Sequence, residues 1–369
     1  MHSPPVSGRS TNMCRYISPG RRSRRIVLMQ RLSPPEQRKL SDLVWAAPAI
    51  NSRYSKYGHP GASVIQCSHS RICVSHIGCN KRICVMSLIT RGVVSVDELA
   101  ADLSNPRLVV IEVHATRPEA SLIPGARAVF WKDLAWHPLE RELATGDVLS
   151  QRLFELGAGV GSRIVLAGDP TQFAAYLLWV LRVRGYQEVA YLDGGLEAWR
   201  AAGIAAADTA VRDTAVEALP VPVPTPEQEL LRIGRDEVRD LLGRDGVVLL
   251  DYRTPEEYSG ARVSGPNAPI DHGAERHGRI PGAKHLFFRD LLDEHGRLRS
   301  RSELQQIVDD KVNGSTSLIV NYCRLSHRST LGWIALSEVL GFDNVRVYDG
   351  SWTEWGSIVG FPIEKSTVK

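Results

Sequence analysis

The 369-residue sequence predicts an α/β protein with two similar domains, each a parallel β-sheet flanked by helices. Two observations support this fold class. Short β-branched strands alternate with helical segments, and the whole pattern occurs twice along the chain. Alternation of this kind is typical of parallel sheets, in which functional sites form at the carboxyl ends of the strands.

An internal repeat relates the two halves of the chain. The tetrapeptide Ile-Pro-Gly-Ala at 123–126 returns at 280–283, an offset of 157 residues. An Asp-Gly pair followed by a tryptophan, at 193–199, returns at 349–355 with an offset of 156 residues. Two matches in nearly the same register indicate that the halves share one fold.

The predicted elements follow the same order in both halves. Each half opens with a helical pattern and a buried strand, and later contains a second strand that leads into a long helix. These elements lie at 96–103, 108–113, 163–167 and 173–184 in the first half, and at 236–242, 247–251, 318–322 and 329–340 in the second.

A connector rich in Ala, Val and Pro separates the halves. It covers residues 205–226 and ends in alternating prolines, a composition that favours an extended, stiff linker. The chain contains no run of 18 apolar residues, so the sequence predicts no membrane-spanning helix. The predicted organisation is a leader at 1–85, a first domain at 86–205, a linker at 206–228 and a second domain at 229–369.

The leader, residues 1–85, differs in composition from the rest of the chain. It holds 14 Lys and Arg residues against Glu36 and Asp42, a net charge of +12, which leaves −8 for residues 86–369. Five of the six cysteines and all four methionines also lie at or before position 86. The segment has few apolar periods, so we expect it to be disordered, or to be an extension upstream of a start at Met86.

Two other interpretations of the leader stay open. Its Arg-rich and Ser-rich composition with few acids resembles an organellar transit peptide. A metal knuckle is the second, although its spacings are wider than the C-x2-4-C pairs of most zinc sites. Its ligands would be Cys67, Cys73, Cys79 and Cys84 with His69 and His76. Nucleic-acid binding is disfavoured, because neither a zinc-finger spacing nor interleaved aromatics accompany the basic charge.

A cysteine at the end of a predicted strand is the main candidate for chemistry. The strand at 318–322 leads into Cys323, which is followed by Arg324, Arg328 and a helical pattern. Backbone N–H groups at a helix N-terminus bind anions, and cationic neighbours stabilise a thiolate. Cys323 is the only cysteine in 86–369, so no disulfide can form within that region and a reducing compartment, by default the cytoplasm, is expected.

These residues resemble the tandem-domain rhodanese family, which includes thiosulfate and mercaptopyruvate sulfurtransferases. The segment 251–260, Asp-x-Arg-x3-Glu-Tyr-x-Gly, is similar to a family stretch, and 345–355 resembles the C-terminal signature of the family in every defined position. The resemblance covers about 86–365. It implies a catalytic second domain and a first domain without the nucleophile, in which Gly168 stands at the position of Cys323.

The resemblance implies transfer of sulfur from thiosulfate, through a persulfide on Cys323, to cyanide or a thiol. Arg324 and Arg328 are expected to clamp the sulfonate end of thiosulfate, and loop N–H groups to hold the persulfide anion. His327 is expected to be an exposed loop histidine. No metal or organic cofactor is implied. The loop residues expected to bind substrate are Arg324, Leu325, Ser326, His327, Arg328 and Ser329.

Four residues outside the loop are expected to support the site: Asp251, Arg253, Glu257 and Trp352. Asp251 and Arg253 are expected to hold the loop floor, and Trp352 to pack as core. Glu257 is interpreted as structural, although several two-domain members carry a substrate-binding arginine there. One loop position departs from the pattern: Ser326 stands where glycine is common, and a residue with a Cβ tolerates left-handed backbone geometry poorly.

Other functions stay open from the sequence. Mercaptopyruvate-using members resemble Cys-Gly-Ser-Gly-Val at the loop, so Arg324 favours thiosulfate as donor. Phosphatases and arsenate reductases on the same fold need C-x5-R, whereas Cys323 and Arg328 form the shorter C-x4-R. A carrier that passes persulfide sulfur to a partner protein, or an inactive binding module, is the alternative without small-molecule turnover.

Overall fold

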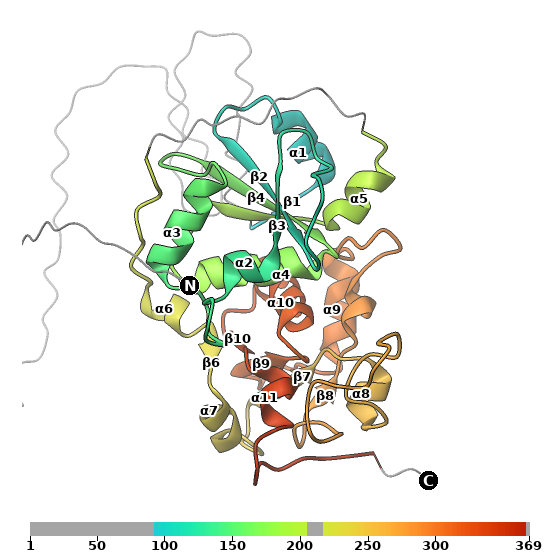
Figure 1. Ribbon diagram of the computed structural model, residues 1–369. Coiled ribbons are helices and arrows are strands. Elements are labelled where there is room, and N and C mark those ends of the chain that lie inside the picture. The colour runs from blue at the N-terminus through green and yellow to red at the C-terminus, as the bar shows by residue number, and fades with distance from the viewer. Residues whose placement is uncertain (1–91, 205–216, 367–369) are drawn as a thin grey trace, which may run out of the picture. The chain divides into compact units, whose positions relative to one another are not determined.

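The computed structural model describes residues 92–204 and 217–366 (Figure 1). The leader at 1–85, with its expected disorder, its transit-peptide interpretation and its cysteine cluster, lies outside the described residues. So does the first part of the expected linker, residues 206–216, whereas 217–228 are described. None of the helices in the described part of the chain is both long and apolar enough to cross a bilayer.

The described chain contains two five-stranded sheets whose neighbouring strands are all parallel. The first has the order β1-β5-β4-β2-β3, with strands β1 (Val93–Val94), β2 (Leu108–His114), β3 (Arg127–Phe130), β4 (Arg163–Asp169) and β5 (Val189–Leu192). The second has the order β6-β10-β9-β7-β8, with strands β6 (Arg232–Ile233), β7 (Val247–Asp251), β8 (Lys284–His285), β9 (Leu318–Tyr322) and β10 (Val345–Tyr348). The predicted α/β class with two parallel sheets is confirmed.

Helices connect the strands, as parallel pairing requires. Those of the first half are α1 (Val96–Asp102), α2 (Trp131–Ala135), α3 (Gly146–Glu155), α4 (Gln172–Val183) and α5 (Gly195–Ala201). Those of the second are α6 (Pro226–Glu229), α7 (Arg235–Asp240), α8 (Pro255–Ser259), the short 3-10 helix η2 (Phe288–Leu291), α9 (Arg301–Asp309), α10 (His327–Trp333), a π-helical continuation η3 (Ile334–Leu340) and α11 (Ser351–Trp355). The long helix predicted at 329–340 therefore begins two residues earlier and changes its winding after Trp333.

Alternating side chains along β9 decide which way the cysteine faces. Leu318, Val320 and Tyr322 pack in the core between the second sheet and helices α7 and α11. Ile319 and Cys323 point to the opposite face, because successive strand residues alternate. The nucleophile candidate thus lies on the face that packs against the first domain.

The inner faces of the two sheets share one continuous hydrophobic core. Helix α4 of the first domain packs against α10 of the second, the two helices that follow the equivalent strands β4 and β9 (Figure 1). Trp131, Tyr176 and Leu177 from the first domain join Tyr252, Leu331 and Trp333 from the second in this core. Apolar side chains of both halves are therefore buried together, and this burial stabilises the contact between the domains.

Strand register fixes which positions of the two domains are equivalent. Val109 pairs with Ile164 across β2 and β4, and Val248 pairs with Ile319 across β7 and β9. Counting forward four residues from each isoleucine places Gly168 of the first domain at the position of Cys323. The equivalence predicted from the sequence agrees with the register of the sheets.

Candidate active site

Cys323 follows the last residue of β9, at the carboxyl end of a strand with neighbours on both sides. Its residue surface is 1% exposed. The backbone N–H of Cys323 donates to the hydroxyl Oγ of Ser351 at 3.2 Å, and its carbonyl accepts the N–H of Trp352 at 3.0 Å. The start of α11 therefore fixes the backbone of the cysteine on both sides.

The loop after Cys323 turns sharply at Ser326, whose φ of 68° lies in the left-handed region. The Ser326 hydroxyl donates to the carbonyl oxygen of Asp349 at 2.7 Å and lies 3.1 Å from the Ser351 hydroxyl. These bonds offset the strain that a Cβ causes in this conformation. Ser326 thus adopts the geometry that glycine would favour, although the sequence suggested a different loop shape.

The loop continues into α10, whose first backbone bond runs from the N–H of Thr330 to the carbonyl of Ser326 at 2.8 Å. The N–H groups of the first three helical residues, His327 to Ser329, have no acceptor within the helix, by its geometry. Ser329 is buried, and its hydroxyl donates to the Ser326 carbonyl at 3.0 Å. Leu325 is half-buried and lines the cleft in front of Cys323.

Arg328 is held by a carboxylate and not by solvent. Its two terminal nitrogens donate to the two carboxylate oxygens of Glu257 at 2.7 and 3.0 Å, and its side chain is 15% exposed. Glu257 is the third residue of α8 and also caps that helix together with Thr254. The structural role expected of Glu257 agrees with these contacts. The clamp role of Arg328 stays a prediction, in which its guanidinium would serve the carboxylate and the substrate together.

The Glu257 carboxylate has a lowered pKa. Burial raises it, but the hydrogen bonds and the positive charge of Arg328 outweigh burial and bring the pKa below the ordinary 4.5. A depressed folded-state pKa contributes stability that is present above the unfolded-state value and is lost as the pH falls through the folded-state value. The Arg328–Glu257 pair therefore stabilises the loop at neutral pH and fails in acid.

A Glu257→Gln variant tests this pair. We expect lower stability than wild type at pH 7, with the gap narrowing as the pH drops below about 4.5, because the wild-type carboxylate is then protonated as well. Urea unfolding of both proteins at several pH values measures this difference in the free energy of unfolding. Glu237→Gln, which removes the half-exposed partner of Arg346, is the control and should show a smaller effect with little pH dependence. A gap between Glu257→Gln and wild type that stays constant down to pH 3 would contradict the assignment.

Arg324 lines the cleft beside Cys323. Burial is the main cause that lowers its pKa, and the charge of Arg328 acts in the same direction. Its Nε is buried, and no hydrogen-bond partner lies in reach among the described residues. The chain passes close to this guanidinium at Gly273, where an added Cβ would lie 2.5 Å from Nε. An unpaired donor on a partly desolvated cation is suited to an anionic ligand.

Asp251 and Arg253 form a fully buried ion pair below the loop. Arg253 donates Nε and Nη2 to the Asp251 carboxylate at 2.9 and 2.7 Å, and the hydroxyl of Tyr322 donates to the same carboxylate at 2.7 Å. The Arg253 guanidinium lies 4.6 Å from the ring centre of Trp352, which is itself buried. The pair and the tryptophan are buried and none of the three is among the described residues that line the cleft, while their role in holding the floor of the loop stays a prediction.

A cleft of about 400 Å³ opens at Cys323, and both domains line it. Of the described residues that line it, three are cations and none is a carboxylate. The first domain contributes Ala115, Phe130, Trp131, Lys132, Gln172 and Phe173, and the second contributes Gly265, Cys323, Arg324, Leu325, His327 and Arg328. The sequence did not point to the first-domain residues, since none of them stands in a motif.

The expectation of an exposed His327 is wrong. This histidine is 8% exposed, and its ring lies 4.3 Å from Trp131, 4.4 Å from Phe173 and 4.8 Å from Tyr176 between ring centres. Burial, followed by the charge of nearby arginines such as Arg141, lowers the pKa of His327 well below 6.5. The histidine is neutral at pH 7 and packs as part of the wall between the domains.

Ser351 is the contact residue of Cys323 that sequence reasoning missed. It has a left-handed φ of 51°, and the equivalent residue of the first domain, 156 positions earlier, is Gly195 with a φ of 55°. The first domain has glycine at this position and the second has serine. This difference in the sequence was the signal that the turn of the second domain needs a side chain. In the second domain that side chain accepts the N–H of Cys323.

The equivalent site in the first domain has no space for a nucleophile. A Cβ built on Gly168 would lie 2.6 Å from the carbonyl oxygen of Thr171 and 2.8 Å from that of Pro170. Such distances require the backbone to move. The first domain is therefore closed to a thiol at this position.

A Gly168→Cys variant is expected to lower the unfolding temperature without producing a second persulfide. Thermal unfolding measures the first effect, and intact mass after thiosulfate treatment, on a Cys323→Ser background, measures the second. Gly314→Cys is a matched control, because no atom lies within 4 Å of a Cβ at that position. A gain of one sulfur atom in the Gly168→Cys variant would contradict the steric argument.

Comparison with known proteins agrees with this geometry. The rhodanese-like domain model matches the chain twice, at residues 95–202 and 234–358. Thiosulfate sulfurtransferase of Corynebacterium glutamicum is 35% identical over 277 residues, which cover 74% of this chain and 90% of that protein. Sulfur carrier protein TtuD of Thermus thermophilus is 32% identical over 278 residues, which cover 74% of this chain and 96% of that protein.

Solved structures share the fold at lower identity. EanB in complex with ergothioneine superposes with a TM-score of 0.63 at 21% identity, covering 76% of this chain and 72% of that chain. YnjE superposes with a TM-score of 0.61 at 22% identity, covering 74% and 68%. With the family model matched in both halves and relatives aligned over nearly their whole length, the chain belongs to the rhodanese family of sulfurtransferases and contains two rhodanese-like domains.

Proposed function

We propose that the protein is a thiosulfate sulfurtransferase that carries sulfur as a persulfide on Cys323. The position of the thiol carries this proposal. Cys323 stands at a strand end, in a cleft whose lining, in the part of the chain that the structure describes, has three cations and no carboxylate. Such a lining favours an anionic donor. The curated relative named thiosulfate sulfurtransferase supports the same donor.

The proposed reaction has two displacement steps. The Cys323 thiolate attacks the outer sulfur of thiosulfate, a sulfur–sulfur bond forms on the enzyme, and sulfite leaves with the electron pair of the old bond. An acceptor, cyanide or a thiolate, then attacks the outer sulfur of the persulfide and the Cys323 thiolate departs. Backbone N–H groups of the loop from Arg324 to Ser329 would hold the negative charge in both steps.

The donor is proposed to be bound through Arg324. Its buried Nε has no partner among the described residues, whereas Arg328 is already engaged by Glu257. We expect Arg324→Gln to raise KM for thiosulfate by about tenfold or more, because a charge-assisted bond to the sulfonate is lost. The steady-state rate of sulfite release at several thiosulfate concentrations measures this KM. The exposed Arg117→Gln variant is the control, and an unchanged KM in Arg324→Gln would contradict the role.

The first test of the function is intact mass of the full chain before and after thiosulfate, with sulfite measured in the same sample. A gain of one sulfur atom that cyanide removes would support the persulfide route. If the mass does not increase by one sulfur atom, thiosulfate is not the sulfur donor. Repeating the experiment with 3-mercaptopyruvate then tests the alternative that the protein is a mercaptopyruvate sulfurtransferase.

A second candidate function is a persulfide carrier that hands sulfur to a partner protein, as the name of the relative TtuD suggests for that protein. The persulfide would form in the same way, and only the acceptor differs. Comparing how fast a small thiol and a protein thiol discharge the preloaded persulfide separates the two. For either function we propose the cytoplasm as the compartment, because a single reactive thiol needs reducing conditions.

A further inference from the structure

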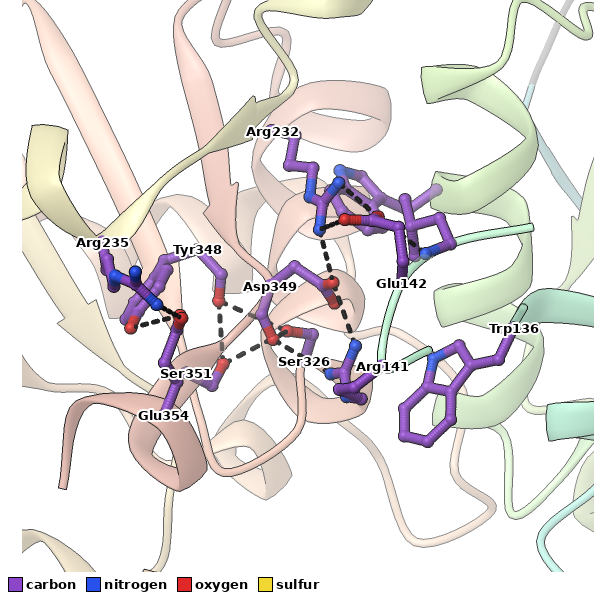
Figure 2. Close-up of polar contacts among 12 residues, drawn as sticks. Trp136, Arg141, Glu142, Arg232, Arg235, Ser326, Tyr348, Asp349, Ser351 and Glu354 are labelled. Atoms are coloured by element: carbon purple, nitrogen blue, oxygen red, sulfur yellow. Dashed lines mark hydrogen bonds and ion pairs between the residues drawn. The ribbon is translucent and has the colours of Figure 1, made fainter. Parts of the chain in front are cut away.

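A buried carboxylate of the second domain is held from the first domain. Asp349 follows β10 and is 2% exposed. Arg141 of the first domain donates Nη1 to Asp349 Oδ2 at 3.2 Å and Nη2 to the Asp349 carbonyl at 3.4 Å. The hydroxyl of Tyr176, also from the first domain, donates to Asp349 Oδ1 at 3.2 Å. Figure 2 shows the carboxylate between Arg141 and Arg232, the latter donating to Oδ2 at 3.3 Å.

The first domain presents Arg141 on a fixed segment. Trp136 and Leu143 form a bridge that closes the hairpin carrying it, and the Arg141 guanidinium lies 4.1 Å from the ring centre of Trp136. The next residue, Glu142, accepts both terminal nitrogens of Arg232 at 2.6 and 3.2 Å. Two arginines and two carboxylates thus alternate across the interface, so no charge in the cluster lacks an opposite partner.

The same turn that carries Asp349 also holds the cysteine loop. The Asp349 carbonyl accepts the Ser326 hydroxyl at 2.7 Å, and Ser351, two residues on, accepts the N–H of Cys323 at 3.2 Å. Ser326 and Ser351 have left-handed backbones at φ 68° and 51°, and their hydroxyls lie 3.1 Å apart. The strained backbone at Ser326 and at Ser351 therefore depends on the position of the turn that carries Asp349.

We propose that Arg141 and Asp349 are positioning residues for Cys323: the first domain, although it has no nucleophile, sets the shape of the sulfur-transfer loop by holding the Asp349 turn. The consequence for turnover rests on the proposed function, while the effect on the loop does not. Removing the Arg141 guanidinium leaves Asp349 with one cation in place of two, and of its direct contacts from the first domain only the hydrogen bond from Tyr176 remains.

The repeat supplies an internal control. Asp193 is the residue equivalent to Asp349, and it also contacts the opposite domain: its Oδ1 accepts the N–H of Leu298 at 2.8 Å. Leu298 closes the second-domain hairpin that begins at Leu292, as Leu143 closes the one carrying Arg141. The turn at Asp193 adjoins Gly168, which bears no thiol. A change at Asp193 therefore weakens the interface without touching the cysteine loop.

The test compares the full-length Arg141→Gln, Arg141→Lys and Asp193→Asn variants with wild type. Hydrogen exchange of the peptide that contains Cys323 to Thr330, measured without thiosulfate, reports how firmly the loop is held. In Arg141→Gln we expect exchange of this loop peptide to be at least about fivefold faster than in wild type, while exchange of the β4 peptide 163–169 stays unchanged. Arg141→Lys should partly restore the slow exchange of the loop peptide. In Asp193→Asn the loop peptide should exchange as in wild type. Turnover of thiosulfate should fall about tenfold in kcat with KM within about twofold, since the donor contacts remain.

Three results would overturn the proposal. Equal exchange of the loop in Arg141→Gln and wild type would show that the turn does not depend on Arg141. Equal effects of Arg141→Gln and Asp193→Asn would make the contact a general interface bond. A change in KM alone would make Arg141 a donor-binding residue. If wild type shows no turnover of thiosulfate, the proposed function fails, whereas the exchange experiment still decides whether Arg141 positions the loop.

Discussion

Cys323→Ser is expected to abolish sulfur transfer, leaving less than about one-thousandth of the wild-type rate, because no other group in the cleft can take up sulfur. A serine hydroxyl is too weak a nucleophile and too strong a base to form and release the corresponding adduct. The substitution exchanges one atom in a buried position, so the fold should be unaffected. Intact mass after thiosulfate should show no added sulfur.

The leader contains five further cysteines, which makes a control necessary. Cyanolysis of the Cys323→Ser variant and peptide mapping of wild type identify which thiol carries the sulfur. A variant with Cys14, Cys67, Cys73, Cys79 and Cys84 all replaced by serine should transfer sulfur like wild type. Labile sulfur that persists in Cys323→Ser and disappears in that variant would place the chemistry outside the rhodanese-like domains.

Arg253→Met is expected to destabilise the second domain by about 3–5 kcal/mol, since it leaves the Asp251 carboxylate buried without its cation. Arg253 and Asp251 are both fully buried, and Arg253 also donates to the carbonyl of Gly278 at 2.8 Å. The methionine fills most of the volume but supplies no donor. Equilibrium unfolding in urea measures the loss, and activity should fall with the folded fraction.

Arg117→Met is the matched control for the loss of an ion pair. Arg117 bonds Asp133 at 2.6 Å, but the two side chains are 74% and 46% exposed, so water replaces the lost contact and the expected change is about 1 kcal/mol or less. Similar losses for both variants would show that burial of the Asp251–Arg253 pair has no special weight. A stable Arg253→Met protein that is inactive would instead point to direct participation of Arg253 in the reaction.

The sequence predicted those features that depend on short segments. The apolar, β-branched run at 318–322 and the helical pattern after it placed Cys323 at a strand end, and the charged pair at Asp251 and Arg253 lies within three residues. Each of these contacts forms between residues whose separation along the chain is fixed by local geometry.

Features of the site that the sequence did not predict depend on how distant segments meet. Arg141 and Asp349 are 208 positions apart, and no periodicity links them. Trp131 and Phe173 stand in no sequence motif, yet they pack against His327 and line the cleft. The expectation that His327 is exposed failed for the same reason, because its cover comes from the other domain.

The shared core of the two sheets has a consequence for how the protein can vary. A duplicated domain that has lost its nucleophile is free of chemical constraint at its own strand end, but Trp131, Tyr176 and Leu177 still form part of the interior of its neighbour. Substitutions at these positions of the first domain are therefore expected to disturb the packing of the second. The second domain expressed alone would expose the apolar side of α10 to water. The two domains of this sulfurtransferase are therefore expected to be needed together.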